Sequence, residues 1–254
     1  MSGYVEFEFD LPSALLVRLI DVLDGVVPAE LNITNLAQMP DEQGVYQLLY
    51  KGKIVYIGKT DGDAGLRRRL LRHSKKVVQR QNLDPKDVTF KAVRIFVFTA
   101  IDLETELIKH YGGVKNIEWN GSGFGSNDPG RERDTSKVGP GHFDYEYPIE
   151  IDRLIDFPIS EGESCFGVLK RLRMDLPFTL RWQTLAKGSR KPHIDLEDST
   201  ISPIMTPVSV RDLIAHLTKC LPSGWQATAF PGYIILYKEA ERHYFSGNVI
   251  AVSR

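Results

Sequence analysis

The sequence predicts an α+β protein with two domains, and three observations support this. Short β-rich segments alternate with amphipathic helices over residues 44–120, a glycine-rich charged stretch follows, and the last part of the chain holds two similar helix–strand segments. The chain has 254 residues, 42% of them hydrophobic and 26% charged, which is typical of a globular protein with a sizeable core. We expect a helical extension at 1–43, a small sheet flanked by helices at 44–145, and an α+β domain at 146–254.

The composition also indicates where the protein works. The N-terminal residues "MSGYVEFEFD" lack the basic start and apolar core of a signal peptide, and no apolar run is long enough to span a bilayer. Two cysteines, Cys165 and Cys220, cannot form a disulfide framework. We therefore expect a cytoplasmic protein with no membrane partner.

An amphipathic helix is predicted near the N-terminus, over residues 11–26. It either covers the core of the first domain or forms a subunit contact, and the first role is favoured.

Residues 44–60, "GVYQLLYKGKIVYIGKT", predict a β-hairpin. A two-residue turn at Lys51-Gly52 would put Tyr46 and Tyr56 on opposite faces. A three-residue loop, 50–52, with Gly52 in a left-handed bulge, pairs Tyr46 directly with Tyr56. We favour the bulged loop, because Lys-Gly is a poorer two-residue turn than Asn-Gly.

The net charge of −1 hides a local asymmetry, since "GLRRRLLRHSKKVVQR" at 65–80 carries seven Lys or Arg residues and no acid. A helix here has an apolar side and a basic side, the latter with Arg69, Arg72, His73, Lys76 and Arg80. A solvated face and a phosphate-binding face are about equally good interpretations of this pattern.

A third strand is predicted at 88–98, followed by a short helix that begins near Asp102. Glu104 lies in the first turn of this helix, where a carboxylate also complements the helix dipole. Trp119 and Asn120 come next in "EWNG".

Taken in order, these elements resemble the GIY-YIG nuclease family. The family pattern is a GIY-like tripeptide, a YIG tripeptide after a short turn, an arginine on the next helix, a glutamate on a later helix, and an asparagine beyond it. The matching residues span 44–120 and are Gly44-Val45-Tyr46, Tyr56-Ile57-Gly58, Arg69, Glu104 and Asn120.

A narrower resemblance is to the restriction endonucleases of that family. They carry an arginine and a histidine four residues apart, as Arg69 and His73 are, and a Gly-Phe-Gly and Pro-Gly rich loop after "WN". The segment before Asn120 is a few residues longer than usual, so Asn116 is a second candidate for its role. The adjacent Trp119 favours Asn120.

The residue types suit phosphodiester hydrolysis. Glu104 would hold a single Mg²⁺ on its own, because Mg²⁺ seldom needs more than one or two carboxylates from the protein. Mn²⁺ can substitute for it. Arg69 would clamp the scissile phosphate in bidentate fashion. Tyr46 would accept a proton or position the water, with its pKa lowered from ~10 by the metal and nearby cations. Tyr56 and His73 would orient the water and the phosphate, with His73 a second candidate base. Lys59 would support either group, and Asn120 would hold the site together.

Two segments are expected to contact DNA. The glycine-rich stretch 121–148 is either a flexible linker or a loop that orders on DNA, where arginine and asparagine side chains read base edges. The expected contacts are Arg67, Arg68, Arg72, Lys76 and Arg80 on the basic helix, and Phe124, Asn127, Arg131, Arg133 and Lys137 in the loop.

The C-terminal region contains an internal similarity. "SCFGVLKRLRMDLP" at 164–177 aligns without gaps with "SVRDLIAHLTKCLP" at 209–222, and each segment leads through Leu-Pro to a predicted strand. We expect a small domain of two similar helix–strand units.

The sequence therefore predicts a metal-dependent endonuclease that acts on double-stranded DNA, of restriction or phage-defence type. The alternatives are a structure-specific repair nuclease and an inactive DNA-binding or assembly module. One catalytic set per chain predicts a homodimer on DNA for double-strand cleavage.

Overall fold

The computed structural model describes residues 3–6, 10–60, 65–96, 102–126, 128, 130–239 and 241–254. The chain is α+β and divides into two compact units. The first contains Met1–Ser74 and Asp84–Gly125, and the second Lys75–Leu83 and Ser126–Arg254. The expected boundary at 145/146 therefore differs from the observed one, because the glycine-rich segment after Gly125 packs within the second unit.

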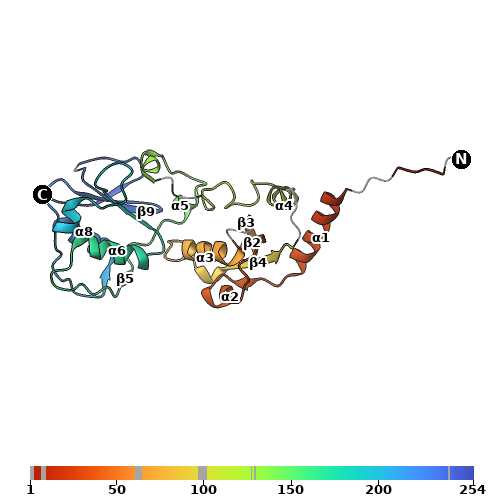
Figure 1. The fold of residues 1–254 in the computed structure, drawn as a ribbon, viewed down its shortest axis with the longest axis horizontal. Coiled ribbons are helices and arrows are strands. Elements are labelled where there is room, and N and C mark those ends of the chain that lie inside the picture. Colours follow the sequence, from red (N-terminus) through yellow and green to blue (C-terminus); the bar gives the residue numbers. More distant parts are fainter. Residues whose placement is uncertain are drawn as a thin grey trace. The chain divides into compact units, whose positions relative to one another are not determined.

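A four-stranded antiparallel sheet forms the centre of the first unit (Figure 1). Its strand order is β1-β4-β2-β3, with β1 at Ala29–Glu30, β2 at Gly44–Tyr50, β3 at Lys53–Thr60 and β4 at Val88–Arg94. Strand β2 is buried along almost its whole length, since β3 and β4 flank it and helices cover both faces. The third strand was expected to reach residue 98, and residues 97–98 lie outside the described part of the chain.

The β2–β3 turn corrects the expected hairpin geometry. Lys51 and Gly52 both have positive φ, 51° and 80°, so they form a two-residue turn that pairs Tyr50 with Lys53. An irregularity comes next, in which Leu49 pairs with Ile54 and Leu48 with Tyr56. The bulge thus lies in β3 and not in the turn. It still leaves the two tyrosines on one face, because it shifts the register by one residue.

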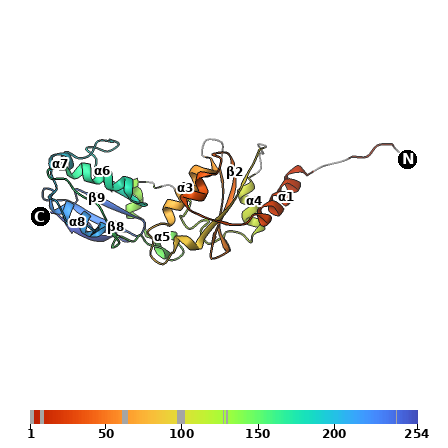
Figure 2. The ribbon, with the colours of Figure 1, turned by 90° about the horizontal axis from the view of Figure 1, so that it is seen from below.

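Helices cover both faces of this sheet, with α3 (Leu66–Val77) and α4 (Leu103–His110) on opposite sides of β2 (Figure 2). Helix α1 (Leu11–Gly25) packs beside α4, and its Leu19 and Leu23 are buried in the core of the first unit. The N-terminal helix therefore covers this core, the favoured of its two expected roles. Two shorter elements are α2 (Ile33–Ala37) and a 3₁₀ turn at Pro85–Asp87.

The second unit has its own four-stranded sheet, with the order β10-β8-β9-β6. The strands are β6 (Thr179–Trp182), β8 (Gln226–Phe230), β9 (Tyr233–Tyr237) and β10 (Asn248–Val252), and β6 runs parallel to β9. A second, two-stranded sheet joins β5 (Leu154–Ile155) to β7 (Val208–Ser209). The remaining helices are α5 (Phe143–Glu146), α6 (Cys165–Asp175), α7 (Ile194–Asp198), α8 (Val210–Lys219) and a 3₁₀ helix at Gly130–Thr135.

The two similar segments form corresponding helices. Ser164 caps α6 and Ser209 caps α8, each through a side-chain oxygen that accepts a backbone N–H three residues on. The matched apolar positions of both helices are buried in one core. The helices lead to different strands, since α6 precedes the single strand β6, whereas α8 precedes the hairpin β8–β9.

None of the helices among the described residues combines the length and apolar content required to cross a membrane.

Candidate functional site

Two tyrosines on the β2–β3 hairpin form the centre of the candidate site. The ring centroids of Tyr46 and Tyr56 lie 6.0 Å apart, and both side chains are buried. Tyr46 pairs across the sheet with Gly58, where an added Cβ would lie 2.4 Å from the Tyr46 hydroxyl. Glycine at the end of "YIG" is therefore required because the Tyr46 ring lies over its backbone.

A second glycine accommodates the second tyrosine. A Cβ on Gly125 would lie 2.4 Å from the hydroxyl of Tyr56. Sequence reasoning did not single out Gly125, although "GFG" in the glycine-rich segment was the available signal.

Helix α3 brings a histidine and an arginine to Tyr46. The His73 Nε2 atom lies 2.8 Å from the Tyr46 hydroxyl, and Arg69 Nε donates to the same oxygen at 3.3 Å. Their spacing of four residues places both on one side of the helix. The imidazole of His73 and the guanidinium of Arg69 therefore both contact the phenol oxygen of Tyr46.

Phe124 holds the His73 ring in place. The two rings stack with centroids 4.8 Å apart and an interplanar angle of 14°, and Phe124 is fully buried. The expectation that Phe124 contacts DNA is therefore wrong, because its ring is enclosed by His73, Tyr56 and Trp119.

The protonation of Tyr46 also differs from expectation. Burial raises the pKa of the Tyr46 phenol well above its ordinary value, with Tyr56 adding to the effect and Arg69 opposing it. We expected nearby cations and a metal to lower this pKa, but among the protein's own groups burial prevails. Tyr46 is therefore a neutral hydroxyl at neutral pH, able to donate as well as accept a hydrogen bond.

Glu104 lies at the start of α4, next to the end of β3. Its carboxylate is half-buried and accepts the backbone N–H of Lys59 at 3.2 Å. Burial raises the pKa of Glu104, and the nearby Asp102 adds to the rise, while the Lys59 hydrogen bond and the charge of Arg69 oppose it. A divalent cation at this carboxylate would offset the cost of its burial.

The Lys59 ammonium is directed to Asp102. Its Nζ donates to Asp102 Oδ1 at 2.8 Å, and this contact lowers the pKa of Asp102 to about 2 and raises that of Lys59. Thr105 donates to the other oxygen of Asp102 at 2.6 Å. Lys59 thus takes part in the site through its backbone N–H to Glu104, and its side chain fixes the start of α4.

The donor set fits a lightly ligated metal ion. Within the described ranges no three His, Cys, Asp or Glu side chains group together in a way that would hold a metal. Mg²⁺ commonly keeps several waters and takes one or two carboxylates, so Glu104 alone suits it, whereas Asp102 is engaged by Lys59 and Thr105.

Asn120 supports the hairpin from its edge. Its Oδ1 accepts the N–H of Ile57 at 2.8 Å, and its Nδ2 donates to the carbonyl of Ile57 at 2.9 Å. These two bonds occupy the free edge of β3 as another strand would. Asn116, the alternative candidate, is exposed in the turn after α4.

The basic helix splits into exposed and buried cations. Arg67 and Arg68 pair with Asp41, and Arg72 Nη2 donates to the carbonyl of Gly125 at 3.3 Å. Arg80 was expected on the DNA-facing side, but it is buried and its Nη1 lies 2.9 Å from Asp144. Arg80 therefore serves the interior of the second unit.

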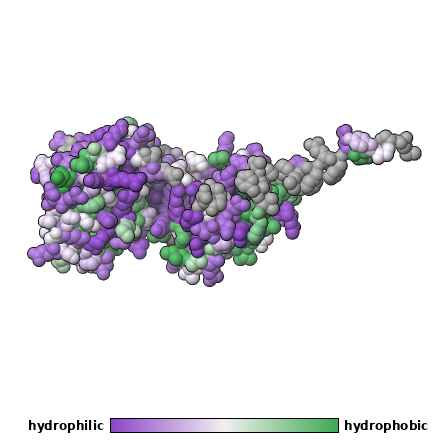
Figure 3. All heavy atoms as spheres, viewed as in Figure 1, coloured by the Kyte–Doolittle hydropathy of each residue, from purple (hydrophilic) through white to green (hydrophobic). Residues whose placement is uncertain are grey.

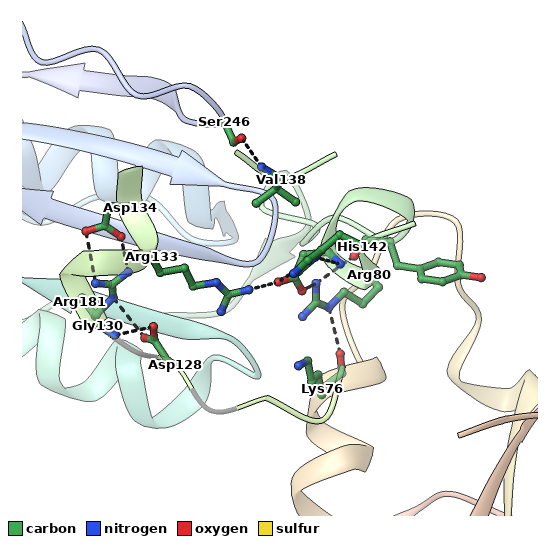
Figure 4. A network of polar contacts seen from close by, with 12 residues as sticks. Lys76, Arg80, Asp128, Gly130, Arg133, Asp134, Val138, His142, Arg181 and Ser246 are labelled. Atoms are coloured by element: carbon green, nitrogen blue, oxygen red, sulfur yellow. Dashed lines mark hydrogen bonds and ion pairs between the residues drawn. The ribbon is translucent and has the colours of Figure 1, made fainter. Parts of the chain in front are cut away.

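The basic residues of the glycine-rich segment lie in the second unit. Arg133 and Arg80, both labelled in Figure 4, belong to one network of polar contacts. They bind opposite oxygens of the buried Asp144. Arg131 stacks on Tyr237 with its Cζ 4.0 Å from the ring centroid. Three further residues were expected to contact DNA. Lys76 is half-buried near Phe143, and Lys137 is exposed beside Phe245. Asn127 lies outside the described residues.

No model of a known protein family matches this chain, and no curated protein sequence matches it.

Proposed function

We propose that this protein is a metal-dependent DNA endonuclease of the GIY-YIG type. The observation that carries the proposal is the convergence of Tyr46, His73 and Arg69 at one hydroxyl, on the same hairpin whose end binds Glu104. These residue types match the family pattern, and their contacts support the proposed chemistry. The sequence order alone did not require them to meet.

Each side chain has a chemical role in this proposal. Glu104 holds a divalent cation, Mg²⁺ or Mn²⁺, which supplies charge stabilisation at the scissile phosphate. Arg69, half-buried and hydrogen-bonded to Tyr46, clamps the phosphoryl oxygens with its planar guanidinium. Tyr46 orients the attacking water through its hydroxyl, while His73, hydrogen-bonded to that hydroxyl, takes up the proton.

The finer proposal is a restriction or phage-defence enzyme. The "WN" followed by a Gly-Phe-Gly segment supports it, since this segment supplies both Phe124, which stacks on His73, and Gly125, which makes room for Tyr56. The second candidate is a structure-specific repair nuclease, which shares the same catalytic residues.

The test is digestion of plasmid DNA in Mg²⁺, followed by sequencing of the cut ends. A restriction enzyme yields ends at one recurring sequence. Cuts that map to junctions, flaps or lesions would favour the repair enzyme, and intact plasmid under all conditions would contradict nuclease function.

We further propose that the protein acts as a homodimer on duplex DNA. A single set of Tyr46, Arg69 and Glu104 serves one strand, and two subunits related by a twofold axis match two strands of opposite polarity. Light scattering on a cleavable duplex should give the mass of two chains per DNA, with little nicked circle during plasmid digestion. A monomer that releases mostly nicked circle would contradict both the dimer and the restriction type.

A further inference from the structure

A tryptophan and a row of cations lie at one edge of the second unit's sheet. Strand β6 is an edge strand, and Trp182 at its end is half-buried. Phe166 meets the Trp182 ring edge-on at 5.7 Å, and the Arg173 guanidinium lies 5.2 Å from its centroid. Because Phe166, Lys170 and Arg173 follow helical spacing on α6, one face of this helix borders Trp182.

The cations of this region outnumber its acids. From Phe166 to His193 the sequence has seven Lys or Arg residues and one acid, Asp175. Arg171 pairs with Glu163, and Arg181 with Asp134. The other five are exposed and take part in none of the ion pairs found in the described part of the chain, namely Lys170, Arg173, Lys187, Arg190 and Lys191.

A short hairpin keeps the last three of these cations at the same edge. Thr184 forms a bridge with Pro192, and the Leu185 N–H donates to the Lys191 carbonyl at 3.0 Å. The loop between them therefore extends directly from the end of β6. The cations stop where α7 begins, since α7 carries the exposed Glu197 and Asp198.

We propose that this surface, the β6 edge defined by Trp182 and the five cations, binds the backbone of duplex DNA. Solvated protein surfaces usually mix charges of both signs. Figure 3 shows hydrophilic residues over much of the visible face. Five cations without an acidic partner instead provide the charge that phosphates require, and their binding releases counterions. Trp182 restrains the Arg173 guanidinium by stacking and adds an apolar contact for the sugars of the DNA backbone.

This role extends the proposed function, because it gives the C-terminal unit a part in holding the DNA that the first unit cuts. It rests on the proposed function only because that function identifies DNA as the negatively charged ligand. An acidic protein partner would fit the cations but gives no reason for an aromatic ring among them.

The experiment is a salt titration of duplex binding by fluorescence anisotropy, in a Glu104→Gln background that prevents cleavage. The test variant carries Arg173→Glu and Lys191→Glu. The matched control carries Arg153→Glu and Lys219→Glu, which make the same charge change at exposed cations outside the edge, and Lys219 belongs to α8. Thermal melting checks that both variants are folded.

We expect the test variant to bind the duplex at least about ten-fold more weakly, with the slope of log affinity against log salt reduced by about two. The control should stay within about two-fold. A Trp182→Leu variant should bind more weakly with an unchanged slope, because it removes an uncharged contact. Equal binding by the test and control variants would overturn the proposal and favour another partner.

The outcomes for this edge and for the nuclease are separable. If the wild-type protein cuts plasmid while the test variant binds like the control, the edge proposal fails and the nuclease stands. If binding depends on the edge but the wild type never cuts DNA, the nuclease fails and the edge stands.

Discussion

Gly58 and Gly125 show how single residues shape the candidate site. Each lies so close to a tyrosine hydroxyl that even a methyl group would meet it at 2.4 Å. Neither glycine has an unusual backbone conformation in this structure, so close approach and not backbone freedom accounts for them. The tyrosines and the glycines thus pack together, and each phenol occupies space that a side chain larger than that of glycine would fill.

Replacing Gly58 with alanine should therefore displace the Tyr46 ring. We expect DNA cleavage to fall by at least about ten-fold and stability by about 1–3 kcal/mol, as for other overpacked cores. Plasmid cleavage and denaturant unfolding measure the two effects. Gly139→Ala is the matched control, because a Cβ there meets open space. Equal behaviour of the two variants would show that Tyr46 tolerates displacement.

Glu104 gives a pH prediction whose sign comes from its burial. Burial raises the folded-state pKa of Glu104 above the unfolded value, so the ionised carboxylate costs stability at pH above the folded pKa. This cost disappears as the pH falls below the unfolded pKa of ~4.3. Without metal, Glu104→Gln should melt higher than the wild type at pH 7 and no higher at about pH 4. A lower melting temperature at pH 7 would mean that the carboxylate stabilises the fold.

At the scale of elements, the sequence predicted most of the hairpin and helices but not the register that joins them. The turn residues Lys51 and Gly52 allow two loops, and the choice depends on a bulge in β3, where the cross-strand partners of Leu48 and Leu49 skip a residue. A local sequence pattern does not reveal where such a bulge forms, because strand register depends on how the whole strand packs in the sheet. The sequence predicted correctly that Tyr46 and Tyr56 share one face, but only through the assumption of a three-residue loop, whereas the structure has a two-residue turn followed by a bulge.

Asn120 belongs to this scale, because its amide completes the edge of β3. Asn120→Ala leaves the N–H and carbonyl of Ile57 without these partners, and we expect a loss of about 1–3 kcal/mol in unfolding free energy. The turnover of the remaining folded protein should stay close to that of the wild type at low temperature. A large loss of turnover with unchanged stability would instead place Asn120 in the chemistry.

At the scale of the whole molecule, two units were predictable and their boundary was not. The roles of Arg80 and Arg133 depend on Asp144, which lies 64 residues from Arg80, so a basic run alone could not show that one of its members is buried. The two similar helices were visible in the sequence because their apolar positions repeat at the same spacing. Contacts between distant charged residues leave no such local signal.

The buried Asp144 should be essential to the second unit. Burial alone would raise its pKa, but the charges of Arg80 and Arg133 outweigh burial and hold the pKa below its usual range. Asp144→Asn should cost about 3–5 kcal/mol at pH 7, because it leaves the buried Arg80 and the half-buried Arg133 without a counter-charge. This difference should shrink as the pH falls through the folded pKa of Asp144, where the wild type loses the same charge.

Asp152→Asn is the control for this effect. Asp152 also pairs with an arginine of the second unit, Arg211, but both side chains are exposed, so we expect a change of about 0–1 kcal/mol. Denaturant unfolding at pH 7 compares the two variants. Similar losses for both would show that the buried network contributes no more than a surface pair.

The most direct test of the nuclease assignment is Mg²⁺-dependent cleavage of plasmid DNA by Glu104→Gln and Glu106→Gln. Both glutamates lie in the first turn of α4, but Glu104 meets the end of β3, whereas Glu106 pairs with Lys109. We expect Glu104→Gln to lower the cleavage rate at least about a hundred-fold while duplex binding survives. Glu106→Gln should cleave within about two-fold of the wild-type rate. Comparable cleavage by both variants, or none by the wild type, would contradict the assignment of this cluster as a nuclease site.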